Sequence, residues 1–277
     1  MKNFKLIFKK VIDFFNNLTG DNVSIYAAQA SFFLVISAIP MIMLILTVMS
    51  RFINIDITSL HHAINAFAPA EVTKLLSTIV NELFSKTSSI SLISISAISA
   101  LWAASKGIMA LYTGLNSVYH APTRNWFYSR FFSVLYTLAF IATLTLTIIF
   151  FGFGEWLESY FYGRAAILAE IIHFFLNAKI IIFMIYLTFL FALFYKFLPK
   201  REHTFKSQLP GAAVAAIGWM GFSFFYSLYI ENFTNFSYVY GSLAAVVLLM
   251  VWLYFCMNIF LYGAQINKML ENGFFKK

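Results

Sequence analysis

The amino-acid sequence predicts an all-α, polytopic integral membrane protein: a single helical bundle over residues 1–277, with six transmembrane helices and an N-terminal interfacial amphipathic helix. Apolar residues make up 61% of the chain and charged residues 11%, and the mean hydropathy is +0.80, whereas soluble domains carry about 25% charged residues. The apolar residues form long continuous runs between short clusters of charge. Because these runs are too long for tilted membrane strands, they predict helices and not a barrel.

The spans follow from the length of the apolar runs. A helix that crosses a hydrocarbon core of about 30 Å needs roughly 20 apolar residues. Only Lys106, in the second run, and Lys196, near the end of the fourth, bring charge into the predicted spans. The expected spans are about 27–50, 90–112, 131–153, 180–198, 209–230 and 240–266.

The distribution of charge predicts the orientation. With the N-terminus inside, 13 of the 19 Lys and Arg residues fall in cytoplasmic segments and five in outer segments. Seven of the 11 Asp and Glu residues fall outside, and none lies within a span. By the positive-inside rule, we expect both termini in the cytoplasm.

Two amphipathic helices are expected outside the spans. Residues 3–18 place apolar side chains on one side and lysines on the other, which is typical of a helix in the cytoplasmic interface with its lysines on anionic head groups. Packing of this helix against the spans is the alternative. A second helix, about 70–86, follows Pro69 and has apolar residues at helical spacing. It is expected to cap the outer face of the bundle or to lie on the outer leaflet.

The residues needed for catalysis or metal binding do not form a recognisable pattern. The five histidines are scattered, Cys256 is the single cysteine, and no zinc-protease, P-loop or dinucleotide-binding motif is present. His120, in the segment 117–120, has no acidic partner nearby in the sequence. We therefore expect no enzymatic activity, no catalytic residue, no metal site and no cofactor. The net charge of +8 comes from short clusters between the apolar runs, which indicates the orientation of the protein in the membrane and not a surface for nucleic acid.

Polar groups within the spans are the candidate functional residues. In hydrocarbon such groups need partners, so we expect them to face the bundle interior, where they either form interhelical hydrogen bonds or line a cavity between spans 1, 2 and 6. The candidate cavity or substrate residues are Gln29, Ser37, Lys106, Tyr112, Asn116, Tyr240, Asn258 and Gln265. The candidate hinge or packing residues are Pro40, Pro210, Gly211, Gly218 and Gly241.

Two of these positions have specific alternatives. Lys106 lies 16 residues after Ile90, about 24 Å along a helix. Its ammonium is expected either to snorkel to the cytoplasmic interface or to form a cation at the inner mouth of a cavity. The turn around Tyr240 and Gly241 is expected to anchor the outer end of span 6 or to gate a cavity.

Four blocks of sequence, in order, resemble the YihY/virulence factor BrkB family of bacterial inner-membrane proteins. The blocks are residues 26–40, residues 101–107 with 115–119, residues 198–199 with 209–212 and Trp219, and residues 238–243 with 252–254 and 263–267. The resemblance implies six spans and a place in the bacterial plasma (inner) membrane. Gln265 departs from the family pattern, because members often carry Glu there. Members were formerly labelled ribonuclease BN-like, and others are linked to envelope integrity and to export of lipid or lipopolysaccharide.

These observations favour a membrane transporter or a lipid- or amphiphile-translocating protein of the cell envelope. Membrane lipids, anionic head groups included, are the expected partners, and nucleic acid is not. The alternative is a non-transporting envelope-integrity or scaffold protein. A nuclease is rejected, because the sequence offers no metal-binding cluster for phosphodiester cleavage.

Overall fold

A computed structural model describes residues 16–37, 90–122, 125–152, 179–201, 203–232 and 243–273, together with residues 58, 77 and 81. All regular structure in these ranges is α-helical. The first part consists of a helical turn at 16–20 and an apolar helix, Val23–Ser37, here called the Val23 helix. The longer helices are α5 (Ile90–Tyr119), α6 (Trp126–Gly152), α9 (Lys179–Phe197), α10 (Phe205–Asn232) and α12 (Leu243–Glu271).

The predicted fold class, an all-α membrane protein, is confirmed for the described residues. Three helical segments are long and apolar enough to cross a membrane: Ile180–Phe197, Phe205–Ile230 and Val246–Glu271. The predicted span 90–112 and residues 131–152 of the predicted span 131–153 lie within the longer helices α5 and α6, and residue 153 is not described. The count of six spans stays a prediction. The helix 3–18 lies outside the described residues apart from its last three, and 70–86 lies outside them apart from 77 and 81.

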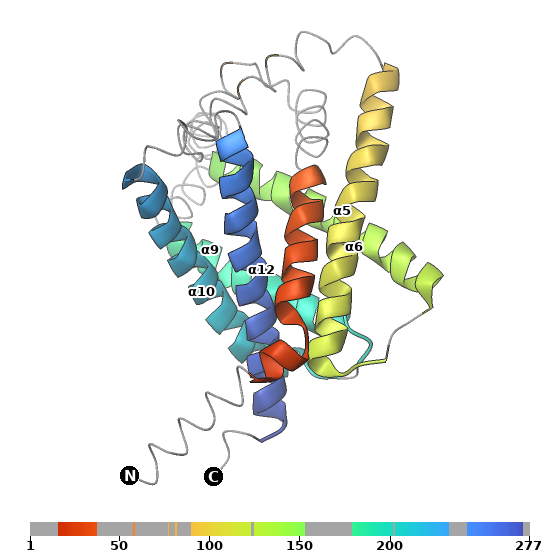
Figure 1. Cartoon of the computed structure of the whole chain (residues 1–277), viewed down its shortest axis with the longest axis vertical. Helices are drawn as coiled ribbons and strands as arrows, with labels where there is room; N and C mark the ends of the chain where they lie inside the picture. Colours follow the sequence, from red (N-terminus) through yellow and green to blue (C-terminus); the bar gives the residue numbers. More distant parts are fainter. Residues whose placement is uncertain are drawn as a thin grey trace, which may run out of the picture.

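α12 lies at the centre of the described bundle, between α10 and the Val23 helix (Figure 1). α10 packs against both α9 and α12, and α5 packs against both α6 and α12. The Val23 helix lies close to α5. A Cβ atom added at Gly114 of α5 would come within 2.9 Å of Tyr26 Cβ, and one added at Gly107 would come within 3.1 Å of the Leu34 side chain. These contacts bury a core that includes Leu115, Tyr195 and Leu261.

α10 and α12 approach each other at two glycines. A Cβ atom added at Gly263 would lie 2.5 Å from the hydroxyl of Tyr195, 2.6 Å from the carbonyl oxygen of Gly211 and 2.7 Å from Cβ of Ala215. One added at Gly211 would overlap the carbonyl oxygen of Gly263. The hydroxyl of Tyr195 donates to the carbonyl of Phe260 at 2.6 Å, which joins α9 to the same stretch of α12. Only glycine lets the two backbones meet this closely.

α10 begins at Phe205, four residues before the predicted start of the fifth span, so Pro210 lies inside the helix. Proline lacks an N–H group and disturbs the preceding turn. The side chain of Asn267 on α12 supplies hydrogen bonds to backbone groups on either side of this proline. Its Oδ1 accepts from the backbone N–H of Gly211 at 2.7 Å, and its Nδ2 donates to the carbonyl of Gln208 at 2.9 Å. Gly218 lies farther along the same face, where an added Cβ would lie 3.1 Å from Ile259.

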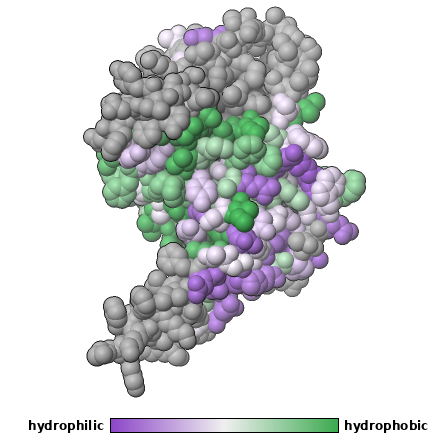
Figure 2. Space-filling view, viewed as in Figure 1, coloured by the Kyte–Doolittle hydropathy of each residue, from purple (hydrophilic) through white to green (hydrophobic). Residues whose placement is uncertain are grey.

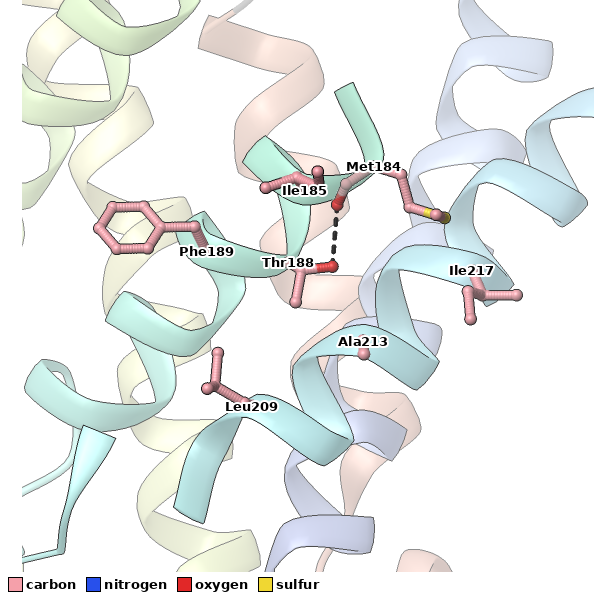
Figure 3. A pocket seen from close by; sticks show the side chains of 7 residues that line it. All are labelled: Met184, Ile185, Thr188, Phe189, Leu209, Ala213 and Ile217. Atoms are coloured by element: carbon pink, nitrogen blue, oxygen red, sulfur yellow. Dashed lines mark hydrogen bonds between the residues drawn. The ribbon is translucent and has the colours of Figure 1, made fainter. Parts of the chain in front are cut away.

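The surface of the described bundle is divided by polarity. Figure 2 shows hydrophilic residues gathered mainly at its lower end, below surface that is largely apolar. The apolar part includes a groove of about 260 Å³ between α9 and α10, here called the α9–α10 groove. Its lining residues are Met184, Ile185, Thr188 and Phe189 of α9 with Leu209, Ala213 and Ile217 of α10 (Figure 3).

Alanine at Gly263 or Gly211 should destabilise the protein. The added methyl groups would push α10 from α12, and overpacking of this kind costs about 1 to 3 kcal/mol. Thermal unfolding of the purified protein in detergent measures the loss. Gly221→Ala is the matched control, because nothing lies within 4 Å of an added Cβ there and alanine favours the helix. If Gly263→Ala unfolds at the same temperature as Gly221→Ala, the glycine contact does not hold the helices together.

Candidate functional site

The predicted site residues that the structure describes do not gather in one place. Gln29 is exposed on the Val23 helix, in contrast to the expectation that polar groups within spans face the interior. Ser37 is buried, but its hydroxyl donates to the carbonyl of Leu34 in its own helix at 2.9 Å. Tyr112 is buried in α5. Pro40, Tyr240 and Gly241 lie outside the described residues.

Lys106 lies in the middle part of α5 and away from the polar end of the bundle. It comes 14 residues before His120, which corresponds to about 21 Å along the helix. Its side chain is half-buried, and its Nζ lies 5.2 Å from the centroid of the Phe33 ring, a cation–π contact with the Val23 helix. Lys106 therefore contributes to the contact between the Val23 helix and α5.

Asn258 and Gln265 lie on the face of α12 that meets the Val23 helix and α5. Ser24 donates its hydroxyl to Oδ1 of Asn258 at 3.3 Å, and Nδ2 of Asn258 donates to the carbonyl of Tyr254 at 2.8 Å. Gln265 lies two turns farther along this face and is fully buried. Neither polar atom of its side chain has a hydrogen-bond partner among the residues that the structure describes.

A partly buried group of titratable side chains, here called the ion cluster, lies at the end of this face, and its His120 side chain is 66% exposed. Oδ1 of Asp21 lies 2.9 Å from Nε2 of His120, and Oδ2 of Asp21 lies 3.2 Å from Nζ of Lys268. The Nζ of Lys268 also lies 3.1 Å from Nε2 of His120. The side chains of Asp21 and Lys268 are only 10% and 16% exposed, so water screens this pair less than a surface pair. The cluster links the turn before the Val23 helix to the ends of α5 and α12.

Local backbone geometry sets two of these residues in place. His120 has φ of 50° and terminates α5, because its N–H donates to the carbonyl of Ser117 at 3.1 Å and that of Ala121 to the carbonyl of Asn116 at 2.9 Å. Asn22, with φ of 55°, makes the turn that carries Asp21. The hydroxyl of Ser117 donates to the carbonyl of Asp21 at 2.8 Å, which holds this turn against α5.

We call this arrangement the polar seam, since it runs between the Val23 helix, α5 and α12. It offers the buried amide of Gln265, which can both donate and accept, three residues before Lys268 of the ion cluster. A solute that carries hydrogen-bonding groups could replace the missing partners of the amide. The seam consists of Asp21, Ser24, Ser117, His120, Asn258, Gln265 and Lys268.

A second group of contacts, the Arg201 network, lies on the opposite side of α12. Nη1 of Arg201 lies 2.7 Å from Oε2 of Glu271, and Nη2 donates to Oε1 of Gln208 at 2.6 Å. Its guanidinium carbon lies 3.2 Å from the centroid of the Tyr119 ring. Asn267 joins the network through Gln208, as described above. The network ties α5, α10, α12 and the connection between α9 and α10 together.

Tyr119 and Asn116 both face this network. The hydroxyl of Tyr119 donates to Oε1 of Gln208 at 3.1 Å. Burial raises the pKa of Tyr119 above its ordinary value, and the neighbouring guanidinium of Arg201 only partly opposes this. The phenol therefore stays a hydrogen-bond donor at physiological pH. Oδ1 of Asn116 accepts from the backbone N–H of Lys200 at 3.4 Å, which directs Asn116 to the α9–α10 connection and not to the seam.

His120 has an acidic partner in the structure, although none is nearby in the sequence. Asp21 is 99 residues away in the sequence, and the turn at Asn22 brings the two side chains together. Asp21, Arg201, Gln208, Lys268 and Glu271 were not among the predicted site residues. The available signal was weak: Asp21 and Glu271 are acidic residues in segments that are otherwise rich in lysine and arginine. In the described part of the chain, no three His, Cys, Asp or Glu residues form a group that could hold a metal ion.

Arg201→Lys should destabilise the protein by about 1 to 3 kcal/mol, which is the cost of leaving buried hydrogen-bonding groups unpaired. Lysine cannot reach Glu271 and Gln208 with a planar fork while it stacks on Tyr119. Thermal unfolding in lipid nanodiscs provides the measurement. Lys200→Arg, at an exposed neighbouring position, should unfold like the wild type. An unchanged unfolding temperature for Arg201→Lys would show that the fork geometry contributes nothing.

Comparisons with known proteins agree with a membrane protein. The profile of the family described as Virulence factor BrkB matches residues 14–276. The chain is 26% identical to YfkH of Bacillus subtilis (strain 168), which is named a ribonuclease-like protein, over 88% of this chain and 89% of that relative. It is also 26% identical to a UPF0761 membrane protein of Alteromonas mediterranea, over 95% of this chain and 88% of the relative. No solved structure matches the chain.

Proposed function

The chain belongs to the virulence factor BrkB family of membrane proteins, and from this premise we propose that it is a transporter that moves an amphiphile across the membrane along the polar seam. Gln265 carries the proposal. A fully buried amide without a partner costs about 1 to 3 kcal/mol for each unpaired group. Polar residues inside a membrane are costly, and they usually face the bundle interior or a cavity. A substrate head group that hydrogen-bonds to Gln265 during passage would account for this cost.

In this proposal, the side of α12 that faces α10 stays fixed, and the side that faces the Val23 helix opens. On the side of α10, the Gly211–Gly263 contact and the Arg201 network fix the helices against each other. On the side of the Val23 helix, the ion cluster of Asp21, His120 and Lys268 closes one end of the seam. We propose that this end is cytoplasmic, that the membrane is the bacterial inner membrane, and that separation of the cluster opens the seam. The proposed role involves no covalent change in the substrate and no metal.

Gln265→Leu should lower transport about tenfold, which corresponds to the loss of one hydrogen bond to a charged head group. Purified protein in liposomes with fluorescent phospholipids, both anionic and zwitterionic, allows the rate of lipid movement between leaflets to be measured by quenching from outside. Thr137→Val is the matched control, since it also removes a buried polar group, a hydroxyl that bonds to Ser133 in its own helix at 2.7 Å, but on α6.

A wild-type rate equal to that of protein-free liposomes for every head group would contradict the proposal. It would favour the second candidate, an envelope-integrity or scaffold protein that does not transport. The observation in favour of that candidate is the close packing of α10 on α12, where Gly263 leaves no room even for a methyl group. A wild-type rate that Gln265→Leu and Thr137→Val leave equally unchanged would remove the seam from the proposal.

A further inference from the structure

The α9–α10 groove faces outward and is apolar. Ile185 and Phe189 of α9 are 62% and 52% exposed, and Ile217 of α10 is 58% exposed. In a membrane protein, such side chains face lipid. The hydroxyl of Thr188 is already used, because it donates to the carbonyl of Met184 at 2.8 Å (Figure 3). The groove therefore suits a hydrocarbon chain.

The length of the groove matches one leaflet of the bilayer. From Leu209 to Ile217 it follows α10 for about 12 Å, at 1.5 Å per residue. Half of a hydrocarbon core of about 30 Å is roughly 15 Å. The groove begins four residues after the start of α10 at Phe205, about 6 Å into the helix. The groove therefore extends from about 6 Å to about 18 Å into α10, so most of it lies within the leaflet next to the polar end of the bundle.

Both helices place a lysine at this end of the groove. On α9, Lys196 follows Phe189 by seven residues, and on α10, Lys206 precedes Ala213 by seven residues. Seven residues are close to two helical turns, so each lysine lies on the stripe of its helix that lines the groove. The rings of Phe189 of α9 and Phe205 of α10 pack against each other, with centroids 5.6 Å apart.

The two lysines keep charge available for a ligand. The Nζ of Lys196 donates to the backbone carbonyl of His203, which uses one of its three donors and no counter-charge. Lys206 is exposed and makes no ion pair with any residue in the described ranges. Arg201, between them in the sequence, is instead neutralised by Glu271 at 2.7 Å. An anion at the mouth of the groove would meet two ammonium groups.

We infer that the α9–α10 groove binds one acyl chain of an anionic phospholipid, whose phosphate lies between Lys196 and Lys206. This is a lipid site on the outer surface of the bundle, separate from the polar seam. It does not depend on transport. A chain of the leaflet provides the apolar contact, and the pair of lysines selects a negatively charged head group.

Photo-cross-linking tests the inference directly. The full-length protein is placed in phosphatidylcholine vesicles that carry a trace of phosphatidylglycerol with a diazirine in its acyl chain, or the matching phosphatidylcholine probe. Mass spectrometry of peptides then locates the adducts. We expect adducts on α9 and α10, with about 25 times more from phosphatidylglycerol, because each of the two lysines should contribute about fivefold. Lys196→Gln and Lys206→Gln should each lower this preference about fivefold, whereas Lys200→Gln, which removes a charge from the α9–α10 connection, should not.

Filling the groove should remove the adducts whatever the head group. Ala213→Phe places a ring in the middle of the groove, and Ile217→Trp blocks its far end as a second, independent variant. Val214→Phe is the matched control, because Val214 is 49% exposed on α10 and does not line the groove. Equal labelling of Ala213→Phe, Ile217→Trp and Val214→Phe would overturn the site. Equal labelling of the wild type by the two lipids would overturn the anionic ligand. Neither result depends on the liposome transport rates.

Discussion

The contact between α10 and α12 at Gly211 and Gly263 is the constraint on which the described bundle depends. It brings two backbones together inside a membrane protein, where helix association depends on close packing because lipid is as apolar as the side chains. Asn267 strengthens this contact, since it bonds to α10 on both sides of Pro210. α9 packs on α10, and α5 packs on α12, so both outer helices take their positions from this pair.

The polar seam and the Arg201 network follow from the central position of α12. One face of this helix packs against α10 through Gly263, which meets Gly211, and through the hydrogen-bonded amide of Asn267. The other face meets the Val23 helix and α5 through Gln265, an amide with no hydrogen-bond partner among the described residues, and through the ion cluster at its end. α12 therefore has one side that packs closely on α10 and another side that carries the unpaired amide of Gln265. On the seam side, Gly114 of α5 lies against Leu261 of α12 and Tyr26 of the Val23 helix, and no glycine of α12 among the described residues meets these two helices.

Much of the fold could be predicted, and less of the site. Hydropathy placed the helical spans that the structure describes, and polarity alone singled out Asn258 and Gln265 in the span that contains them. The same reasoning gave no partner to His120, because Asp21 and Lys268 are 99 and 148 residues away from it. Charges near span ends are informative about orientation, but many pairings are compatible with the same composition. The choice among them depends on how each helix is rotated about its axis.

The sequence by itself determined that this protein is a bundle of membrane helices, because the free energy of placing a segment in lipid depends on the composition of that segment. It also contained the two lysines at seven-residue spacing from groove residues on α9 and α10. Only the tertiary structure decided that these stripes face each other across a groove, that Gln29 points outward, and that Asp21 meets both His120 and Lys268. These features depend on which helices touch and at what rotation. That choice is fixed by contacts such as Gly211 with Gly263, whose strength comes from the fit of two surfaces and not from either sequence segment alone.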